Sequence, residues 1–285
     1  MLRQKAEYEI FTLSRHPASD IKTKHFVAEA LDEKSLRDIV LTVKPKIIVN
    51  FIGASTSTEA LVELTRINTG VILNLVSILG IKNLSETRII TMGSAAEYGG
   101  CSGKLISEEE PARPVSAYGI SKLAQTAIAK QFNESLGSRI DVVRPFNLIG
   151  ANSPESLISQ KICRKVLALE SSENLYLDDA EMERDFVDID DFTKGLLNLI
   201  ETECLPGVFN VCSGKAVSLR SLAEAFMIAG GKSGKVLQSP QSKFRSPVRR
   251  AVGDSTKMSG ATGWVVSKTL QQAASEQIKT AASFF

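Results

Sequence analysis

Short apolar runs rich in β-branched residues alternate along this chain with longer segments of helical periodicity. The runs are residues 9–13, 24–30, 46–53, 88–94, 140–146 and 207–213, and the helical segments are residues 33–42, 57–79, 117–135, 157–169, 189–201 and 219–228. This alternation is typical of parallel strands joined by crossover helices. It predicts a doubly wound α/β fold, in which ligands bind beyond the carboxyl ends of the strands.

Composition excludes several classes of protein. The chain has 285 residues, 43% of them hydrophobic, which is enough for one large domain or two lobes. Its 34 basic and 32 acidic residues nearly balance, so a nucleic-acid or membrane partner is not expected. Four cysteines without a C-x-x-C pair and only two histidines indicate neither a metal site nor a disulfide framework. No apolar segment approaches the ~20 residues that span a bilayer, and we expect a cytoplasmic protein.

The strongest chemical signal joins a serine at a strand end to a tyrosine and a lysine on a helix. Ser94 lies in GSAAEYG, and Tyr118 and Lys122 lie in SAYGISKLAQ. Four residues apart on a helix, Tyr118 and Lys122 share one face. An ammonium group beside a phenol lowers the phenol pKa from about 10, which makes Tyr118 a usable general acid or base. A lone Y-x-x-x-K pair is weak, but with the serine it predicts exchange of hydride between a carbonyl or alcohol and a cofactor.

These motifs resemble the extended short-chain dehydrogenase/reductase family, the nucleotide-sugar epimerases, dehydratases and reductases. The resemblance covers nearly the whole chain and implies an enzyme with a Rossmann-like sheet. It also implies that Ser94, Tyr118 and Lys122 are catalytic and that Tyr118 and Lys122 bind NAD(P)(H). Gly53, Ala54 and Ser55 match the loop that lines the cofactor, and Asn68, in TRINTGVILNL, matches a family asparagine. A polar residue that pins neighbouring backbone is the plainer interpretation of Asn68.

Motifs further along the chain indicate which members of the family it resembles most. RPFNLIG, ERDFVDIDD, FNVCSGKAVSLRSL and GDSTKMSGATGW together look most like the GDP-4-keto-6-deoxy-D-mannose reductases and the GDP-mannose 4,6-dehydratases. Dehydratases place a carboxylate two residues after the catalytic Ser or Thr, where this chain has Ala96. Glu97 would point to the other face of an extended loop and is better explained as structural. We therefore expect reduction of a 4-keto-6-deoxy sugar nucleotide, with an epimerase, a dehydratase and a non-catalytic dinucleotide-binding remnant as alternatives.

The residues that bind the substrate nucleotide and the cofactor ribose are less well defined. The resemblance assigns Asn147, Arg184 and Arg245, with Ser94, to the sugar nucleotide, whereas a salt bridge to Asp185 or Asp188 is the alternative for Arg184. GDP is implied only by resemblance, because Pro247 or Val248 stands where the family has an acid. Ser14 and Arg15 end the first strand, where an acid would accept the ribose hydroxyl of NAD and an arginine the phosphate of NADP. NADP(H) is favoured and NAD(H) remains possible.

The beginning of the family's fold has no counterpart in this sequence. Family members start with a strand, a glycine-rich turn that binds the pyrophosphate, and a helix, but residues 1–15 contain no such turn. Three explanations are open. In the first, the sequence starts at an internal methionine and the full protein extends about twenty-odd residues upstream. In the second, the chain is a non-catalytic remnant. In the third, residues 9–13 and 46–53 pair directly in a reduced sheet.

The expected domain organisation follows the family. Residues 1–150 form the N-terminally truncated dinucleotide-binding domain, to which residues 188–213 return, and residues 151–187 and 214–285 form the substrate lobe. The resemblance further implies a homodimer formed through residues 57–79 and 117–135, and a role in GDP-mannose metabolism and cell-surface polysaccharide biosynthesis.

Overall fold

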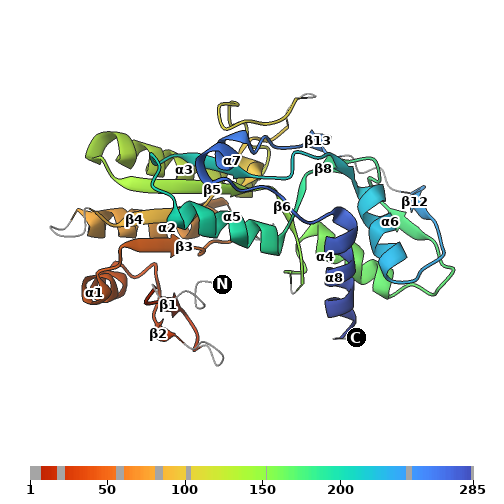
Figure 1. Cartoon of the computed structure of the whole chain (residues 1–285), viewed down its shortest axis with the longest axis horizontal. Helices are drawn as coiled ribbons and strands as arrows, with labels where there is room; N and C mark the ends of the chain where they lie inside the picture. The colour runs from red at the N-terminus through yellow and green to blue at the C-terminus, as the bar shows by residue number, and fades with distance from the viewer. Residues whose placement is uncertain are drawn as a thin grey trace. The chain divides into compact units, whose positions relative to one another are not determined.

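The protein is described by a computed structural model that covers residues 8–17, 23–55, 61–80, 86–100, 104–151, 153–241 and 246–283. Figure 1 labels its helices and strands. The chain divides into two units. The first unit comprises residues 1–93, 120–142 and 205–207, and the second comprises residues 94–119, 143–204 and 208–285. The predicted division at residue 150 into a cofactor domain and a substrate lobe stays a prediction.

Parallel strands form the centre of the first unit. β3 (Ile47–Asn50) pairs in parallel with β4 (Arg88–Met92), from Ile47 opposite Arg88 to Asn50 opposite Thr91. In the sheet, β4 neighbours β5 (Arg139–Pro145), and β10 (Val208–Val211) is a strand of the second unit. Three helices accompany them: α1 (Glu33–Val43), α2 (Leu61–Leu79) and α3 (Ala117–Leu136). The expected α/β class with parallel strands is confirmed.

Local sequence explains where α1 begins and ends. Asp32 is its N-cap and accepts a hydrogen bond from the Lys34 N–H at 3.2 Å, which satisfies one of the free N–H groups of the first turn. Lys44 ends the helix in the left-handed conformation, with φ of 48°. Leu36 and Val40 lie one turn apart and are buried. Asn74 of α2 donates to the carbonyl oxygens of Ala30 and Leu31, which ties α2 to the segment before α1.

The first two strands form a separate sheet. β1 (Phe11–Ser14) pairs in parallel with β2 (Lys24–Val27), from Phe11 opposite Lys24 to Ser14 opposite Val27. Among the described strands, β3 pairs with β4 and not with β1. The proposal that residues 9–13 and 46–53 close up and pair directly is therefore wrong.

Helix α2 is more apolar than the sequence analysis allowed. It has 19 residues, and it alone among the described helices meets the length and hydropathy expected of a membrane span. A core helix of a soluble protein meets the same test. Nine of its side chains are buried, including the polar Asn68 and Thr69, and Glu63 and Arg66 form an ion pair on its surface. We therefore interpret α2 as a core helix.

The second unit consists of short strands and the remaining helices. β6 (Asn147–Ile149) pairs with β9 (Phe186–Asp188), and β7 (Leu175–Leu177) with β12 (Val236–Gln238), both in parallel. β8 (Glu183–Arg184) lies between β11 (Val217–Ser218) and β13 (Arg250–Ala251). The helices are α4 (Ile158–Leu167), α5 (Ile189–Glu201), α6 (Leu219–Ala229), α7 (Thr256–Thr262) and α8 (Leu270–Ala282). A hydrophobic core of α4, α6 and α8 side chains includes Ile162, Phe226 and Ile278.

Candidate active site

Ser94 begins a tight turn two residues after β4 ends. It is the N-cap of the 3-10 helix η2 (Ala95–Glu97), and its hydroxyl oxygen accepts a hydrogen bond from the Ala96 N–H at 3.1 Å. In return, the Glu97 carboxylate accepts a hydrogen bond from the Ser94 N–H at 2.9 Å. This reciprocal capping box holds the Ser94 backbone in one place. The half-buried hydroxyl of Ser94 thus lies on a defined turn rather than a loose loop.

Glu97 is structural, as expected. The condition of an extended loop is not met, because residues 95–97 form a 3-10 turn and Glu97 is fully buried. Its carboxylate accepts hydrogen bonds from Arg144 Nε at 2.9 Å and Nη2 at 2.6 Å. The Arg144 guanidinium also lies 4.5 Å from the centre of the Tyr98 ring. Burial alone would lower the pKa of Arg144, but Glu97 and Tyr98 outweigh it and raise that pKa.

Tyr118 lies in the first turn of α3 and is hydrogen-bonded to Ser94. Its pKa is raised: burial of the phenol is the largest cause, the hydrogen bond to Ser94 lowers the pKa, and the charge of Glu97 raises it. The predicted lowering of the Tyr118 pKa is therefore wrong for this arrangement, because burial disfavours the phenolate. The phenol is kept in its protonated form and can donate a proton.

Lys122 lies one turn further along the continuous helix α3 and belongs to the first unit. Its side chain is buried, with 4% of its surface exposed. The ammonium group donates hydrogen bonds to the Met92 carbonyl oxygen at 2.8 Å and to Gln125 Oε1 at 3.0 Å. A buried ammonium group requires such acceptors, since leaving it unpaired would be costly. Lys122 is therefore held beside the carboxyl end of β4.

Asn68 pins the loop that follows β3. Its side-chain oxygen accepts a hydrogen bond from the Ala54 N–H at 2.9 Å, and its amide donates to the Ala54 carbonyl at 3.1 Å and to Ser121 Oγ at 2.8 Å. The interpretation of Asn68 as a residue that pins neighbouring backbone is confirmed. A Cβ atom on Gly53 would lie 2.8 Å from Asn68 Oδ1 and 3.0 Å from Lys122 Nζ. The structure thus brings Gly53, Ala54, Asn68 and Lys122 together, with Ser55 next along the loop.

The predicted cofactor residues Ser14 and Arg15 end β1. The Ser14 hydroxyl donates to the His16 carbonyl oxygen at 2.7 Å and lies 3.3 Å from His25 Nε2. Arg15 follows the strand and is exposed. His25 of β2 also contacts Thr12 at 2.9 Å, so the imidazole lies beside two hydroxyl groups of β1. The sequence analysis did not single out His25.

Asn147 is turned toward protein backbone. Both its backbone N–H and its side-chain amide donate to the Asp185 carbonyl oxygen at 3.0 Å. The buried Asp185 carboxylate accepts hydrogen bonds from the Ser213 N–H and hydroxyl and from the backbone of Gly214 and Gly253. Burial raises the pKa of Asp185, and these hydrogen bonds lower it to a smaller extent. The substrate role of Asn147 stays a prediction.

Arg184 forms no salt bridge with Asp185 or Asp188, the two carboxylates expected as its partners. Its guanidinium donates to the carbonyl oxygens of Glu183 at 2.7 Å and Val248 at 2.9 Å, and to Ser246 Oγ at 3.2 Å. The alternative of a salt bridge to Asp185 or Asp188 is therefore wrong. Burial lowers the pKa of Arg184. The nearby Arg249 donates to the Asp179 carboxylate at 2.6 Å, whereas the predicted substrate residue Arg245 lies outside the described residues.

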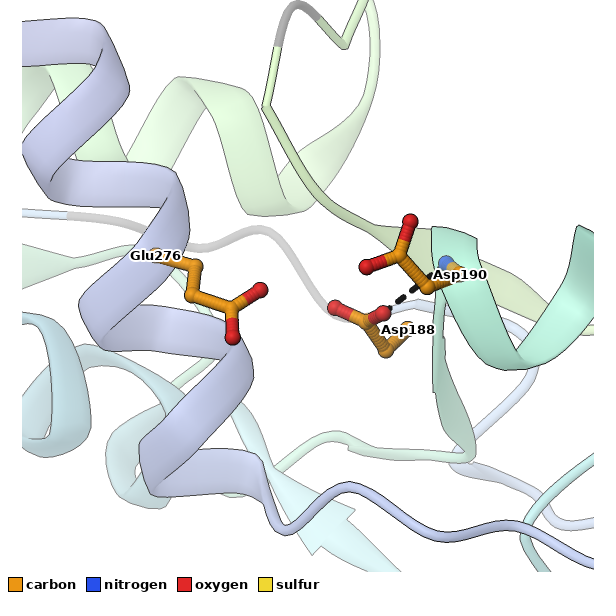
Figure 2. Close-up of side chains that lie close together, drawn as sticks. All are labelled: Asp188, Asp190 and Glu276. Atoms are coloured by element: carbon orange, nitrogen blue, oxygen red, sulfur yellow. Dashed lines mark hydrogen bonds between the residues drawn. The ribbon is translucent and has the colours of Figure 1, made fainter. Parts of the chain in front are cut away.

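Among the described residues, one group of three carboxylates comes close enough together to hold a cation. Asp188, Asp190 and Glu276 converge in the second unit (Figure 2). Lys268 donates to Asp188 at 3.1 Å, to Asp190 at 2.7 Å and also to Glu276. Burial alone would lower the pKa of Lys268, but the hydrogen bonds to the three carboxylates raise it. The protein itself supplies the positive charge here, so the group is better explained as an ion-pair cluster.

A cavity of about 240 Å³ adjoins this cluster and is lined by residues that include Asp188, Lys215 and Lys268. None of the predicted site residues lines it.

Two groups near the site were not found by sequence reasoning. Arg144, which neutralises Glu97, lies in the RPF motif, but its partner is 47 residues away in the chain. Gln125, which holds Lys122, lies three residues further along α3. Helical spacing could have suggested the second pair, whereas nothing local could have identified the first.

The parallel α/β sheet, the strand-end serine and the Tyr-x-x-x-Lys helix define a protein of the extended short-chain dehydrogenase/reductase class. More narrowly, the chain belongs to the GDP-mannose 4,6-dehydratase family, whose model matches residues 3–277.

Known relatives agree with this assignment. GDP-6-deoxy-D-mannose reductase of Pseudomonas aeruginosa is 28% identical over 252 residues, which cover 86% of this chain and 82% of the relative. GDP-6-deoxy-D-talose 4-dehydrogenase of Aggregatibacter actinomycetemcomitans is 22% identical over 274 residues, which cover 92% and 85%. The solved structure of RMD from Pseudomonas aeruginosa complexed with NADPH has a TM-score of 0.81 and 24% identity, and covers 96% of this chain and 99% of that one. This last similarity shows the shared fold.

Proposed function

We propose that this protein reduces the 4-keto group of a 4-keto-6-deoxy sugar nucleotide, with a GDP sugar as the substrate. The observation that carries the proposal is the Ser94–Tyr118 pair, in which a half-buried phenol of raised pKa is hydrogen-bonded to the Ser94 hydroxyl just beyond β4. Reduction of a ketone requires a proton donor at the oxygen that becomes the alcohol, and a phenol that stays protonated suits that task. The reductase relative supports the same reaction.

Each residue has a distinct part in the proposed reaction. A nicotinamide cofactor supplies hydride to the C4 carbon when it is bound. Tyr118 donates its proton to the ketone oxygen, and Ser94 orients that oxygen with its hydroxyl group. Lys122 binds the ribose hydroxyls of the cofactor. Asn68 maintains the backbone of the Gly53–Ser55 loop that lines the cofactor.

The serine turn favours reduction over dehydration. Dehydration needs an additional acid or base near the sugar, but position 96 is alanine and Glu97 is occupied by Arg144 and the Ser94 N–H. An epimerase of the same family, which consumes no reductant, and a non-catalytic dinucleotide-binding protein remain the alternatives.

We propose NADP(H) as the preferred cofactor and NAD(H) as the second possibility. Ser14 and Arg15 stand at the end of β1, where an arginine suits a ribose phosphate and the family acid is replaced by a serine. The P. aeruginosa RMD structure, which contains NADPH, supports this choice. Asn147, Arg184 and Arg245 are proposed to bind the sugar nucleotide.

We further propose a cytoplasmic homodimer that supplies a deoxy sugar for cell-surface polysaccharide. Exposed apolar side chains on α2 and α3 support a dimer, among them Leu61, Val62, Leu73, Ile120 and Leu136. Light scattering coupled to gel filtration measures the mass directly.

The substitution Tyr118→Phe tests the reaction. It removes the proton donor and keeps the ring, so we expect the rate of 4-keto reduction to fall by about 10²- to 10⁴-fold with an unchanged melting temperature. Tyr176→Phe is the matched control, because Tyr176 is half-exposed on β7 and should leave the rate unchanged. Full activity of Tyr118→Phe would refute the proposed role. Conversion of a sugar nucleotide without consumption of NADPH would favour the epimerase.

A further inference from the structure

A chain of buried polar side chains connects β3, β4 and α3 within the first unit. Asn50 ends β3, Thr91 lies on β4, and Lys122 and Gln125 lie on α3. Each of these side chains is at most 4% exposed. Buried polar groups are costly unless they are hydrogen-bonded. Hydrogen bonds link all four side chains to one another.

The donor and the acceptor of each of these hydrogen bonds can be assigned from the groups involved. A lysine ammonium only donates, so Gln125 must present its oxygen to Lys122 Nζ, 3.0 Å away. The Gln125 amide nitrogen then faces Thr91 Oγ1, to which it donates. Asn50 donates to the same hydroxyl oxygen at 3.2 Å and accepts from the Ile52 N–H at 3.0 Å, which fixes its own orientation. The network therefore specifies the orientation of the Gln125 amide.

From this network we propose that Gln125 is a positioning residue of the cofactor site, whose side-chain oxygen holds the Lys122 ammonium group beside Gly53. The role of Lys122 in cofactor binding rests on the proposed function. The hydrogen bond between Gln125 and Lys122 does not, because it is present in the protein without a cofactor. Gly53 belongs to the cofactor-lining loop, and a Cβ atom there would lie 3.0 Å from Lys122 Nζ. The tether thus places a positive charge directly against that loop.

The neutral amide is the feature that distinguishes this tether from an ion pair. A carboxylate at position 125 would hold the lysine equally well and would also cancel its charge. The amide oxygen and the Met92 carbonyl orient the ammonium group while its net charge remains. Gln125→Glu should therefore keep the position of Lys122, whereas Gln125→Met, of similar shape, should lose it.

Chemical labelling tests the tether without any cofactor. Lys122 is acetylated with acetic anhydride, and its rate is compared by peptide mass spectrometry with that of Lys130, an exposed lysine on the same helix. We expect Gln125→Met to accelerate labelling of Lys122 by about tenfold or more, because a hydrogen bond to a charged group is lost. Gln125→Glu should label as slowly as the natural protein. Thr126→Val is the matched control, since the Thr126 hydroxyl is buried and has no hydrogen-bond partner among the described residues.

Binding of NADPH, measured by fluorescence titration, tests the purpose of the tether. We expect Gln125→Met to raise the Kd by about tenfold and Gln125→Glu to raise it as well, because a carboxylate cancels the charge of Lys122, with Thr126→Val unchanged. Equal labelling of Lys122 in all variants would overturn the proposal, as would equal losses in Gln125→Met and Thr126→Val. If the natural chain does not bind NADPH, the proposed function fails, and the labelling ratio alone still decides whether Gln125 holds Lys122.

Discussion

Replacement of Glu97 by glutamine should destabilise the protein strongly. The Glu97 carboxylate is fully buried and serves two partners: one oxygen accepts from Arg144 and the other accepts from the Ser94 N–H. A glutamine offers one oxygen and one NH₂ group, so one of these donors would face another donor. Arg144 is only 2% exposed and would lose its counter-charge.

The magnitude follows from the burial of both groups. Removing one partner of a buried ion pair costs about 3–5 kcal/mol, because the other charge is left unpaired. For a protein of this size each kcal/mol corresponds to roughly 2–4 °C in melting temperature. We therefore expect Glu97→Gln to melt roughly 6–20 °C lower than the natural protein.

Thermal unfolding followed by circular dichroism measures this difference. Glu63→Gln is the control, because the Glu63–Arg66 pair is exposed to solvent and a surface ion pair contributes little to stability. The double variant Glu97→Gln/Arg144→Met should be less destabilised than the sum of its parts. If Glu97→Gln melts within the range of Glu63→Gln, or if the double variant is additive, the reasoning is refuted.

Two further predictions concern charge. A raised pKa keeps Tyr118 protonated at neutral pH, so kcat/KM for ketone reduction should stay level through neutrality and fall only in the alkaline range, above about pH 10. Initial rates over pH check this, and a decline that begins near neutrality would contradict it. Lys268→Ala leaves Asp188, Asp190 and Glu276 without their cation and should lower the melting temperature by roughly 2–6 °C. Millimolar Ca²⁺ should restore part of the loss in this variant but not change the natural protein, because carboxylates are calcium ligands; no recovery would argue against the cluster as described.

The predicted elements that match the structure are the long or strongly apolar ones. Residues 189–201 were predicted as a helix and form α5 with the same bounds. The short strands β8, β11 and β13 were not predicted, since two residues carry no periodic signal and their pairing joins segments far apart in sequence. Helix α8 was also missed, although Thr269 and Gln272 form a capping box that could have been recognised.

At the site, the location of the residues along the chain was easier to predict than the surroundings of their side chains in the folded protein. The location of Ser94 just after a strand and of Tyr118 and Lys122 on one helix was predicted from the alternating strand and helix pattern and is confirmed, whereas their catalytic role came from the family resemblance and stays a prediction. The direction of the Tyr118 pKa does not, because it depends on how much of the phenol is buried. The same holds for Arg184, whose partners come from residues 246–248 in the folded chain.

The second unit is built from separate segments of the chain, so some of its contacts can form only when its last segment has been synthesised. Tyr98 donates to Asn210, 112 residues later, and the Ile106 N–H donates to the Val252 carbonyl oxygen. A ribosome that has released residues 1–207 has made Ser94, Tyr118 and Lys122, but it has not yet made these anchors. Contacts of such high sequence separation form late and slowly. The nascent chain therefore contains its proposed catalytic residues before it contains the residues that bind Tyr98 and Ile106.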